Sequence, residues 1–117
     1  MRDERAFLFD MAERARRVIE FIGGSSHDQF MANVLLQEGV IRQLEIIGEA
    51  AKRITPATRA QLPSLPFSAM AKMRDLVAHV YWGVNLEIVW ATATNDMRPL
   101  IDAIEPLLPP PGGGPTP

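Results

Sequence analysis

The stretch SHDQFMANVLLQEGVIRQLEIIGEAAKRI, residues 26–54, carries the longest helical pattern in this chain of 117 residues. Ser26 is followed three residues later by Gln29, which is the spacing of a capping box at a helix N-terminus. Behind this cap, apolar residues recur at helical intervals: Phe30, Val34, Leu35, Ile41, Leu44, Ile47 and Ile54. The stretch therefore predicts one long helix that ends near Ile54, before a Thr-Pro pair.

Two glycines, Gly39 and Gly48, lie inside this predicted helix. Each should cost about 1 kcal/mol of helix stability relative to Ala. A close approach of a neighbouring helix is the compensation that we expect at these positions.

Similar patterns lie on both sides of residues 26–54. An amphipathic stripe before them predicts a helix over residues 3–22 that Gly23 and Gly24 end, with the apolar positions Leu8, Met11, Ala15, Val18 and Ile22. Three prolines between residues 55 and 66 predict a loop with at most a turn or two of helix. A third helix is expected from Pro66 toward His79, with Gly83 as its stop.

A last helix is predicted from Leu86 to Leu107, with Asn85 as its N-cap. Pro99 in its middle lacks a backbone N–H and should kink it. The apolar positions of this helix are Val89, Trp90, Ala93, Met97, Leu100, Ile101, Ile104 and Leu107.

The predicted elements assign the chain to the all-α class. No strand-like alternation is present, and four helices with short connections favour an antiparallel up-down four-helix bundle with a short extra helical turn. We expect one domain over residues 1–108. The tail PPPGGGPTP, residues 109–117, is predicted to be disordered.

Composition narrows the possible functions. The chain has no cysteine, so disulfides, thiolate nucleophiles and sulfur-ligated metal sites are excluded. The N-terminus has neither a signal peptide core nor a membrane span, which predicts a cytoplasmic protein without membrane contact. A net charge of -2 and a pI near 5.6 argue against sequence-independent gripping of nucleic acid. Any RNA contact should be local or shared with a second subunit.

Motifs for several enzyme classes are missing from the sequence. The only histidines are His27 and His79, and neither belongs to an HExxH or Glu-x-x-His pattern, so we expect no bound metal. There is no P-loop, no GxGxxG after a strand and no GxSxG elbow. We therefore expect no cofactor.

A polar cluster remains on the predicted third helix: Arg74, Asp75, His79 and Tyr81. His exchanges protons near neutral pH, and the fork-shaped Arg suits a phosphate that gains negative charge. These groups suit cleavage of RNA, which supplies its own 2'-hydroxyl nucleophile. At about 100° per residue, Arg74 and Tyr81 share a face, but His79 lies roughly 140° from Arg74. Either the helix ends or distorts near His79, or the site uses two chains.

A structural interpretation of these residues stays open beside the catalytic one. His and Tyr near a helix C-terminus often interact with the helix dipole and the edge of the core. His27, at the start of a helix, is interpreted as a solvated turn residue. The polar band on residues 42–53 could line the site through Arg42, Glu45 and Glu49, or it could face solvent.

Arg74, four residues, His79, one residue and Tyr81 resemble the RxxxxHxY signature of HepT-like toxins in the HEPN superfamily. The segments VIRQLEIIGEAAKRI and MRDLVAHVYWGVNLEIVW are similar to that family's second helix and motif region. The resemblance covers roughly residues 3–108. One departure is Val80, where family members often have Gly.

The resemblance implies a homodimeric helical bundle in which two copies of the motif converge in one cleft. It implies a metal-independent endoribonuclease whose catalytic residues are Arg74 and His79, with Asp75 as a polar helper. Tyr81 matches a tyrosine that a partner nucleotidyltransferase antitoxin of the MntA type modifies with AMP. Beside Arg74, such a bulky anionic group would block the phosphate site.

Two further hypotheses remain. A non-catalytic module that binds a nucleotide or a nucleotidyltransferase would fit the acidic pI, and a simple dimerisation domain would need neither activity.

Overall fold

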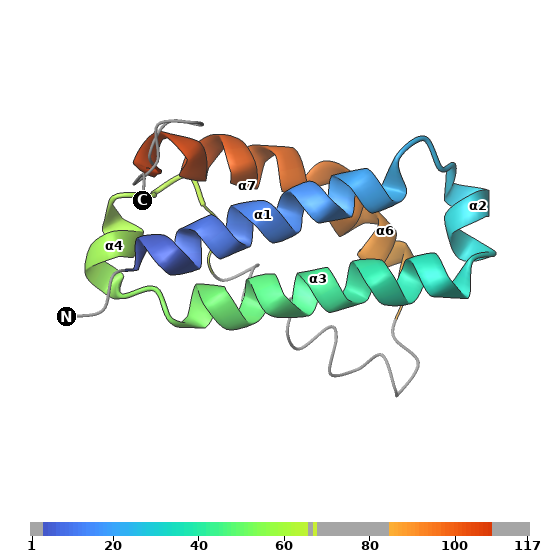
Figure 1. The fold of residues 1–117 in the computed structure, drawn as a ribbon, viewed down its shortest axis with the longest axis horizontal. Helices are drawn as coiled ribbons and strands as arrows, with labels where there is room; N and C mark the ends of the chain where they lie inside the picture. The colour runs from blue at the N-terminus through green and yellow to red at the C-terminus, as the bar shows by residue number, and fades with distance from the viewer. Residues whose placement is uncertain (1–3, 66, 68–84, 109–117) are drawn as a thin grey trace, which may run out of the picture.

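The computed structural model describes residues 4–65, 67 and 85–108, and its elements are helices (Figure 1). In chain order they are α1 (Arg5–Ile22), α2 (His27–Met31), α3 (Val34–Lys52), α4 (Pro56–Ala60), α6 (Leu86–Asn95), α7 (Met97–Ile104) and the 3-10 turn η2 (Glu105–Leu107). The described part of the chain contains no strand, so the protein is all-α as predicted.

The long helices α1 and α3 lie side by side and run in opposite directions (Figure 1). Helix α7 packs on α1 from another side and runs in the same direction as α3. The core between them is formed by fully buried side chains from all three helices: Met11, Ala12, Ala15, Val18, Val40, Leu44, Ile47 and Ile104. All five apolar positions predicted for the first helix are buried, which confirms the stripe that defined it.

The predicted long helix over residues 26–54 is wrong at its N-terminal end, because the chain forms α2 and α3 with a break at residues 32–33. The capping box is confirmed, since Ser26 and Gln29 bond each other's backbone N–H groups at the start of α2. Asn33 starts a second helix by accepting a hydrogen bond from the backbone N–H of Leu36 at 3.0 Å.

Gln37 stabilises this break from the first turns of α3. Its buried amide nitrogen donates to the carbonyl oxygens of Phe30 and Met31 at 2.9 and 3.0 Å. These carbonyls lie at the end of α2, where a helix leaves its acceptors without partners. Because a new helix, α3, begins at Val34 after this break, the predicted core positions Val34 and Leu35 are instead 64% and 81% exposed.

The expectation of close packing at Gly39 is confirmed. A Cβ atom built on Gly39 would lie 3.4 Å from the ring of Phe21 on α1, so the backbone of α3 approaches this ring to within van der Waals contact of one added carbon. Gly23 ends α1 in the left-handed region with φ of 52°, a conformation that glycine adopts without strain.

The proline-rich segment contains one short helix, α4, as predicted. Thr55 caps it by accepting from the backbone N–H of Thr58. Glu4, before α1, accepts hydrogen bonds from the Thr55 backbone and from the hydroxyls of Thr55 and Thr58. These bonds lower the pKa of Glu4, the bond from the Thr55 backbone contributing most, and they join the start of α1 to the start of α4.

The predicted last helix is divided at Asp96 into α6 and α7 rather than bent within one element. Pro99 lacks the N–H that would bond to the carbonyl of Asn95, and its ring crowds that carbonyl. The interruption therefore falls one turn before the proline, and Leu100 resumes the helix by bonding to Asp96 at 3.3 Å. The apolar positions Val89, Ala93 and Ile101 are buried as expected.

Two parts of the predicted architecture lie outside the described residues. The third helix of the expected four-helix bundle falls almost entirely on residues 68–84, and the tail is residues 109–117. The bundle, the domain boundary at residue 108 and the disorder of the tail stay predictions. No helix in the described ranges is both long and apolar enough to cross a membrane.

Leu44 and Leu35 form a matched pair of residues on α3 for testing this core. Leu44→Ala removes a side chain with 0% exposure and should lower the free energy of unfolding by about 2–5 kcal/mol through lost burial and a cavity. Leu35→Ala should change it by less than about 0.5 kcal/mol. Urea denaturation of both variants measures the difference, and equal losses would contradict the register described for α3.

Candidate functional site

The residues predicted to carry the chemistry, Arg74, Asp75, His79 and Tyr81, lie outside the described part of the chain. Their mutual geometry and the predicted dimeric cleft therefore stay predictions. What the structure describes are the two points where the chain enters and leaves residues 68–84. Phe67 stands before that segment, and Asn85 follows it.

Phe67 is buried in the core, and Arg59 of α4 fixes it there. The Arg59 guanidinium lies 5.0 Å from the centre of the Phe67 ring, a cation–π distance. The same guanidinium donates at 3.1 Å to the carbonyls of Ala51 and Ile54, at the end of α3. One side chain thus joins α3, α4 and the entry to residues 68–84.

Asn85 caps α6 at the exit from this segment, as the sequence predicts. Its side-chain oxygen accepts from the backbone N–H of Glu87 at 2.9 Å, and its carbonyl accepts from Ile88 at 3.0 Å. The first turn of α6 is therefore well defined at the point where the motif segment ends.

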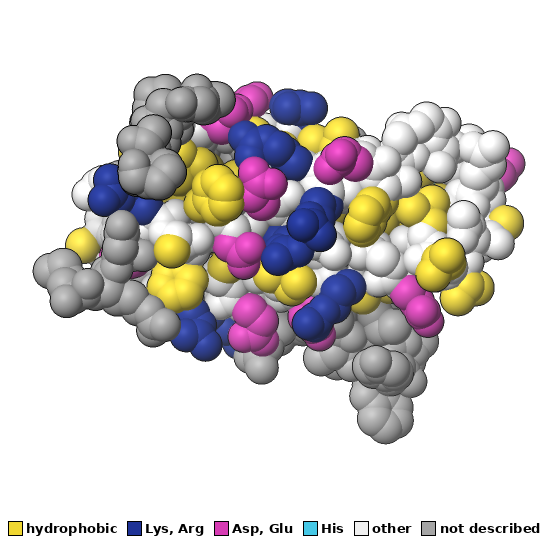
Figure 2. Space-filling model, in the orientation of Figure 1, with side chains coloured by type: hydrophobic (Ala, Val, Ile, Leu, Met, Phe, Trp, Pro, Cys, Tyr) yellow, Lys and Arg dark blue, Asp and Glu magenta, His cyan; other side chains and the backbone are white. Residues whose placement is uncertain are grey.

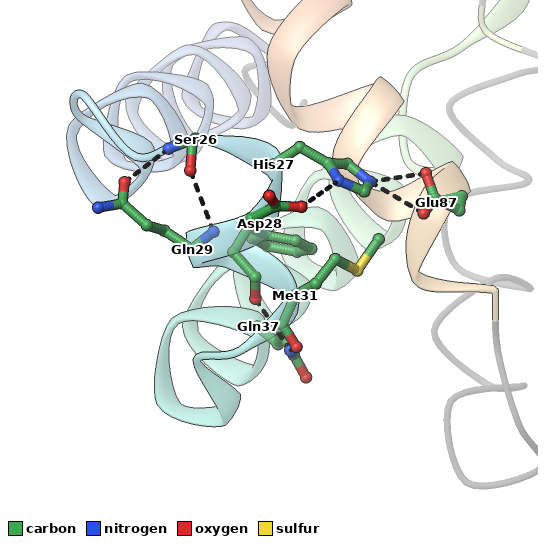
Figure 3. Close-up of polar contacts among 8 residues, drawn as sticks. Ser26, His27, Asp28, Gln29, Met31, Gln37 and Glu87 are labelled. Atoms are coloured by element: carbon green, nitrogen blue, oxygen red, sulfur yellow. Dashed lines mark hydrogen bonds and ion pairs between the residues drawn. The ribbon is translucent and has the colours of Figure 1, made fainter.

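His27 is partly exposed at the start of α2, as predicted, but it also binds this first turn of α6, which its interpretation as a solvated turn residue did not include. Its Nε2 lies 2.8 and 2.9 Å from the two carboxylate oxygens of Glu87 (Figure 3). A carboxylate only accepts hydrogen bonds, so Nε2 carries a proton and donates it. The ring also meets Trp90 edge-on at 5.7 Å between ring centres, and Trp90 contacts Phe30.

The hydrogen bond to Glu87 raises the pKa of His27 above its ordinary value. Desolvation opposes this effect, and the negative charges of Glu87 and Asp28 add to it. Nδ1 lies 3.7 Å from the carboxylate of Asp28, on the opposite side of the ring from Glu87 (Figure 3). His27 is therefore held between two carboxylates that favour its charged form.

The three residues suggested as site lining lie on the polar side of α3. Arg42 forms an ion pair with Glu45, in which the Arg42 side chain is largely exposed. Glu49 is also exposed, one turn further along the helix. That these three residues face Arg74 and His79 stays a prediction.

Two of the arginines on α1 lie in ion pairs with carboxylates. Arg14 pairs with Asp10 and reaches Gln43 of α3, while Arg16 pairs with Glu13 and with Glu105 of η2. Figure 2 shows basic and acidic side chains interleaved across the face formed by α1 and α3. This surface fits the acidic pI and offers no broad positive field to a nucleic acid.

Carboxylates and histidines do not gather into a metal site in the described ranges. No group of three such side chains there is arranged so that it could hold an ion.

Comparison with known proteins agrees with the resemblance in the motif region. Residues 11–107 match the family model described as Ribonuclease HepT-like. The chain belongs to this family. The match spans both described ends of the motif segment and the segment itself.

Several relatives share similar sequence over nearly their whole length. "Putative RNase MJ0127" of Methanocaldococcus jannaschii is 36% identical over 107 residues, which cover 92% of this chain and 88% of that protein. "Probable ribonuclease HepT" of Thermococcus cleftensis is 36% identical over 106 residues, covering 91% and 96%. "Putative RNase TTE0752" of Caldanaerobacter subterraneus is 32% identical over 108 residues, covering 92% and 96%. No solved structure matches the HepT-like chain.

Sequence reasoning missed Glu87, the partner of His27. The two residues are 60 positions apart, and no local spacing relates them. The sequence offered one chemical indication of a role for Glu87. This residue lies in the first turn of a helix that directly follows the motif, where a carboxylate is favourable and can also be reached by another element.

Arg42 tests whether the polar band of α3 belongs to the site. Arg42→Ala breaks an exposed ion pair, so the free energy of unfolding should change by less than about 1 kcal/mol. If the band lines the site, the same variant should weaken RNA binding. Arg98→Ala, an exposed arginine on α7, serves as the control, and equal RNA affinity of the two variants would remove Arg42 from the site.

Proposed function

We propose that this HepT-like protein is a metal-independent endoribonuclease that cleaves RNA next to a 2'-hydroxyl. The observation that supports the proposal most strongly is the family match over residues 11–107, which includes Arg74 and His79 at the spacing of the RxxxxH motif. The relatives named as ribonucleases, similar over nearly their full length, support the same activity.

The proposed reaction needs proton transfer and charge stabilisation. The 2'-hydroxyl loses its proton as its oxygen attacks phosphorus, the bond from phosphorus to the 5'-oxygen breaks, and the leaving oxygen gains a proton. The products are a 2',3'-cyclic phosphate and a 5'-hydroxyl. His79 exchanges one of these protons, Arg74 stabilises the negative charge on the phosphate, and Asp75 assists as a polar neighbour.

The site is proposed to form between two copies of the chain. Arg74 and His79 lie roughly 140° apart on a continuous helix, so one straight helix would not direct both at one phosphate. A homodimer that brings together two motifs would supply both groups. The interleaved charges of α1 and α3 fit this view, because they leave phosphate recognition to a local site.

Regulation by a partner is the second part of the proposal. The protein acts as the toxin of a toxin–antitoxin pair in the cytoplasm, and a nucleotidyltransferase antitoxin of the MntA type silences it by transferring AMP to Tyr81. The added phosphate would lie close to Arg74 in sequence and would compete with RNA for its charge.

An RNA cleavage assay in excess EDTA tests the activity. The wild type should cleave, and His79→Ala and Arg74→Ala should each reduce the rate by about 100-fold or more, because each removes a proton-transfer or charge-stabilising group. Arg98→Ala is the matched control for the loss of an arginine. Mass spectrometry should find the cyclic phosphate, and activity of His79→Ala equal to wild type would refute the role of His79. A chain that binds a nucleotidyltransferase but never cleaves RNA would instead be a binding module.

The single tyrosine of the chain makes the regulatory step easy to follow. After coexpression with a nucleotidyltransferase encoded beside it, we expect the mass of one AMP group on Tyr81 and loss of cleavage. Tyr81→Phe should escape both effects while it still cleaves RNA. Modification at another residue, or inhibition of Tyr81→Phe by the same partner, would contradict this step.

A further inference from the structure

The contact between His27 and Glu87 joins two elements that are distant in sequence. His27 is the first residue of α2, and Glu87 lies in the first turn of α6. Both carboxylate oxygens lie within hydrogen-bond distance of Nε2, at 2.8 and 2.9 Å. Trp90, one turn further along α6, meets the edge of the same imidazole ring. Two side chains of α6 therefore hold one ring of α2 (Figure 3).

Helix α2, which carries His27, is itself held in place by other contacts. The capping box of Ser26 and Gln29 orders the turn that presents His27. Phe30 is fully buried and contacts Trp90. Gln37 joins the end of α2 to α3. Helix α2 is thus held against the core by contacts that do not involve His27. Through His27, it can in turn hold the first turn of α6 in place.

The location of Glu87 connects this contact to the motif. Asn85, whose side chain caps the Glu87 amide, directly follows residues 68–84, and Tyr81 precedes it by four positions. The first turn of α6 is therefore the element to which the chain of the motif segment is directly joined.

We propose that His27 is a positioning residue for the ribonuclease site: by holding Glu87, it fixes the first turn of α6 and so the attachment point of the segment that carries His79 and Tyr81. This inference rests on the proposed function for its effect on activity, whereas the tie between α2 and α6 is independent of it. His27 touches no reacting atom in this role, and it acts through Glu87.

The strength of the contact between His27 and Glu87 depends on pH. The direction of this dependence follows from the charges of the groups around His27. Among the described residues, the charged groups that act on His27 are Glu87 on α6 and Asp28 on α2. Helix α3 also packs on α2, but no charged group of its described residues acts on His27. Both partners are negative and raise the pKa of His27. The stabilisation is thus complete below the ordinary histidine pKa of about 6.5 and is lost as the pH rises through the higher value of the folded protein.

The size of the effect is limited by solvent. The side chains of His27 and Glu87 are 41% and 62% exposed, so water and salt screen their attraction. For a pair of this kind, we expect the loss of the charge to change the local opening equilibrium by about two- to fivefold. Salt at 1 M should reduce the effect further.

An NMR titration of the full chain tests the tie without any assay of activity. The chain has two histidines, so His79→Ala identifies the His27 signal. We expect the pKa of His27 to lie above 6.5 and Glu87→Gln to bring it down toward that value. Asp28→Asn is the matched control, since Asp28 is a carboxylate near the same ring but on α2, and its effect should be smaller. A His27 signal that titrates identically in wild type and Glu87→Gln overturns the tie.

Amide hydrogen exchange then shows which part of the chain the contact between His27 and Glu87 stabilises. At pH 6, Glu87→Gln and His27→Gln should speed exchange of the Ile88 and Val89 amides about two- to fivefold, while amides in the middle of α3 keep their rates. Uniformly faster exchange throughout the chain would mean a general loss of stability and would overturn a local positioning role.

The activity arm compares His27→Gln with wild type across pH. The ratio of kcat values should fall to about one-half to one-fifth below pH 6.5 and return to one above the pKa of His27, with KM unchanged. The reversed pair, His27→Glu combined with Glu87→His, should recover part of the loss. A ratio that stays at one at every pH, or a loss independent of pH, overturns the positioning role.

The two proposals fail in distinguishable ways. If the wild type cleaves no RNA, the proposed function fails and the positioning role fails with it, although the titration still decides whether the tie exists. If the wild type cleaves and His27→Gln behaves as wild type at low pH, the inference about His27 fails alone.

Discussion

The antiparallel packing of α1 against α3 is the contact on which the rest of this structure depends. Ala12 and Ala15, fully buried on α1, keep the helix surface flat there, and the Phe21 ring of α1 lies close to the backbone of α3 at Gly39. Small residues at a helix contact allow the axes to approach and larger neighbours to interdigitate. The other elements are placed from this pair: α7 packs on α1, α4 covers one end, and α2 covers the other (Figure 1).

The two ends of the motif segment are held by different kinds of interaction. At the entry, Phe67 is buried under the Arg59 guanidinium, a contact whose strength changes little with pH because Arg stays charged. At the exit, Glu87 is held by an imidazole whose charge changes near neutral pH. A change in pH near neutrality therefore acts on the contact at the exit and leaves the contact at the entry unchanged. Only the exit lies close in sequence to His79 and Tyr81.

The sequence predicts the helices of this fold better than it predicts their ends. The stripe from Leu8 to Ile22 and the caps at Ser26 and Asn85 depend on local spacing, and the structure confirms them. The break before α3 was missed because it depends on Gln37, whose amide bonds carbonyls six and seven residues earlier and looks like an ordinary helix residue in the sequence. The likeness to HepT-like proteins identified the family, but His27 and Glu87 meet only through the tertiary fold.

Charge pairing on the described surface constrains how an RNA could be recognised. Arg14, Arg16 and Arg42 each have a carboxylate partner, so neutralising a phosphate with one of them would first require separating an ion pair. Separating such an exposed pair costs less than about 1 kcal/mol, but the carboxylate stays nearby and repels a phosphate, so the contact contributes less than one from an arginine without a carboxylate neighbour. For the RNA binding proposed above, this charge pattern favours a few contacts at a confined site over a long basic track. At such a proposed site, a small displacement of one reacting group would change activity strongly, since no extended surface would compensate for it.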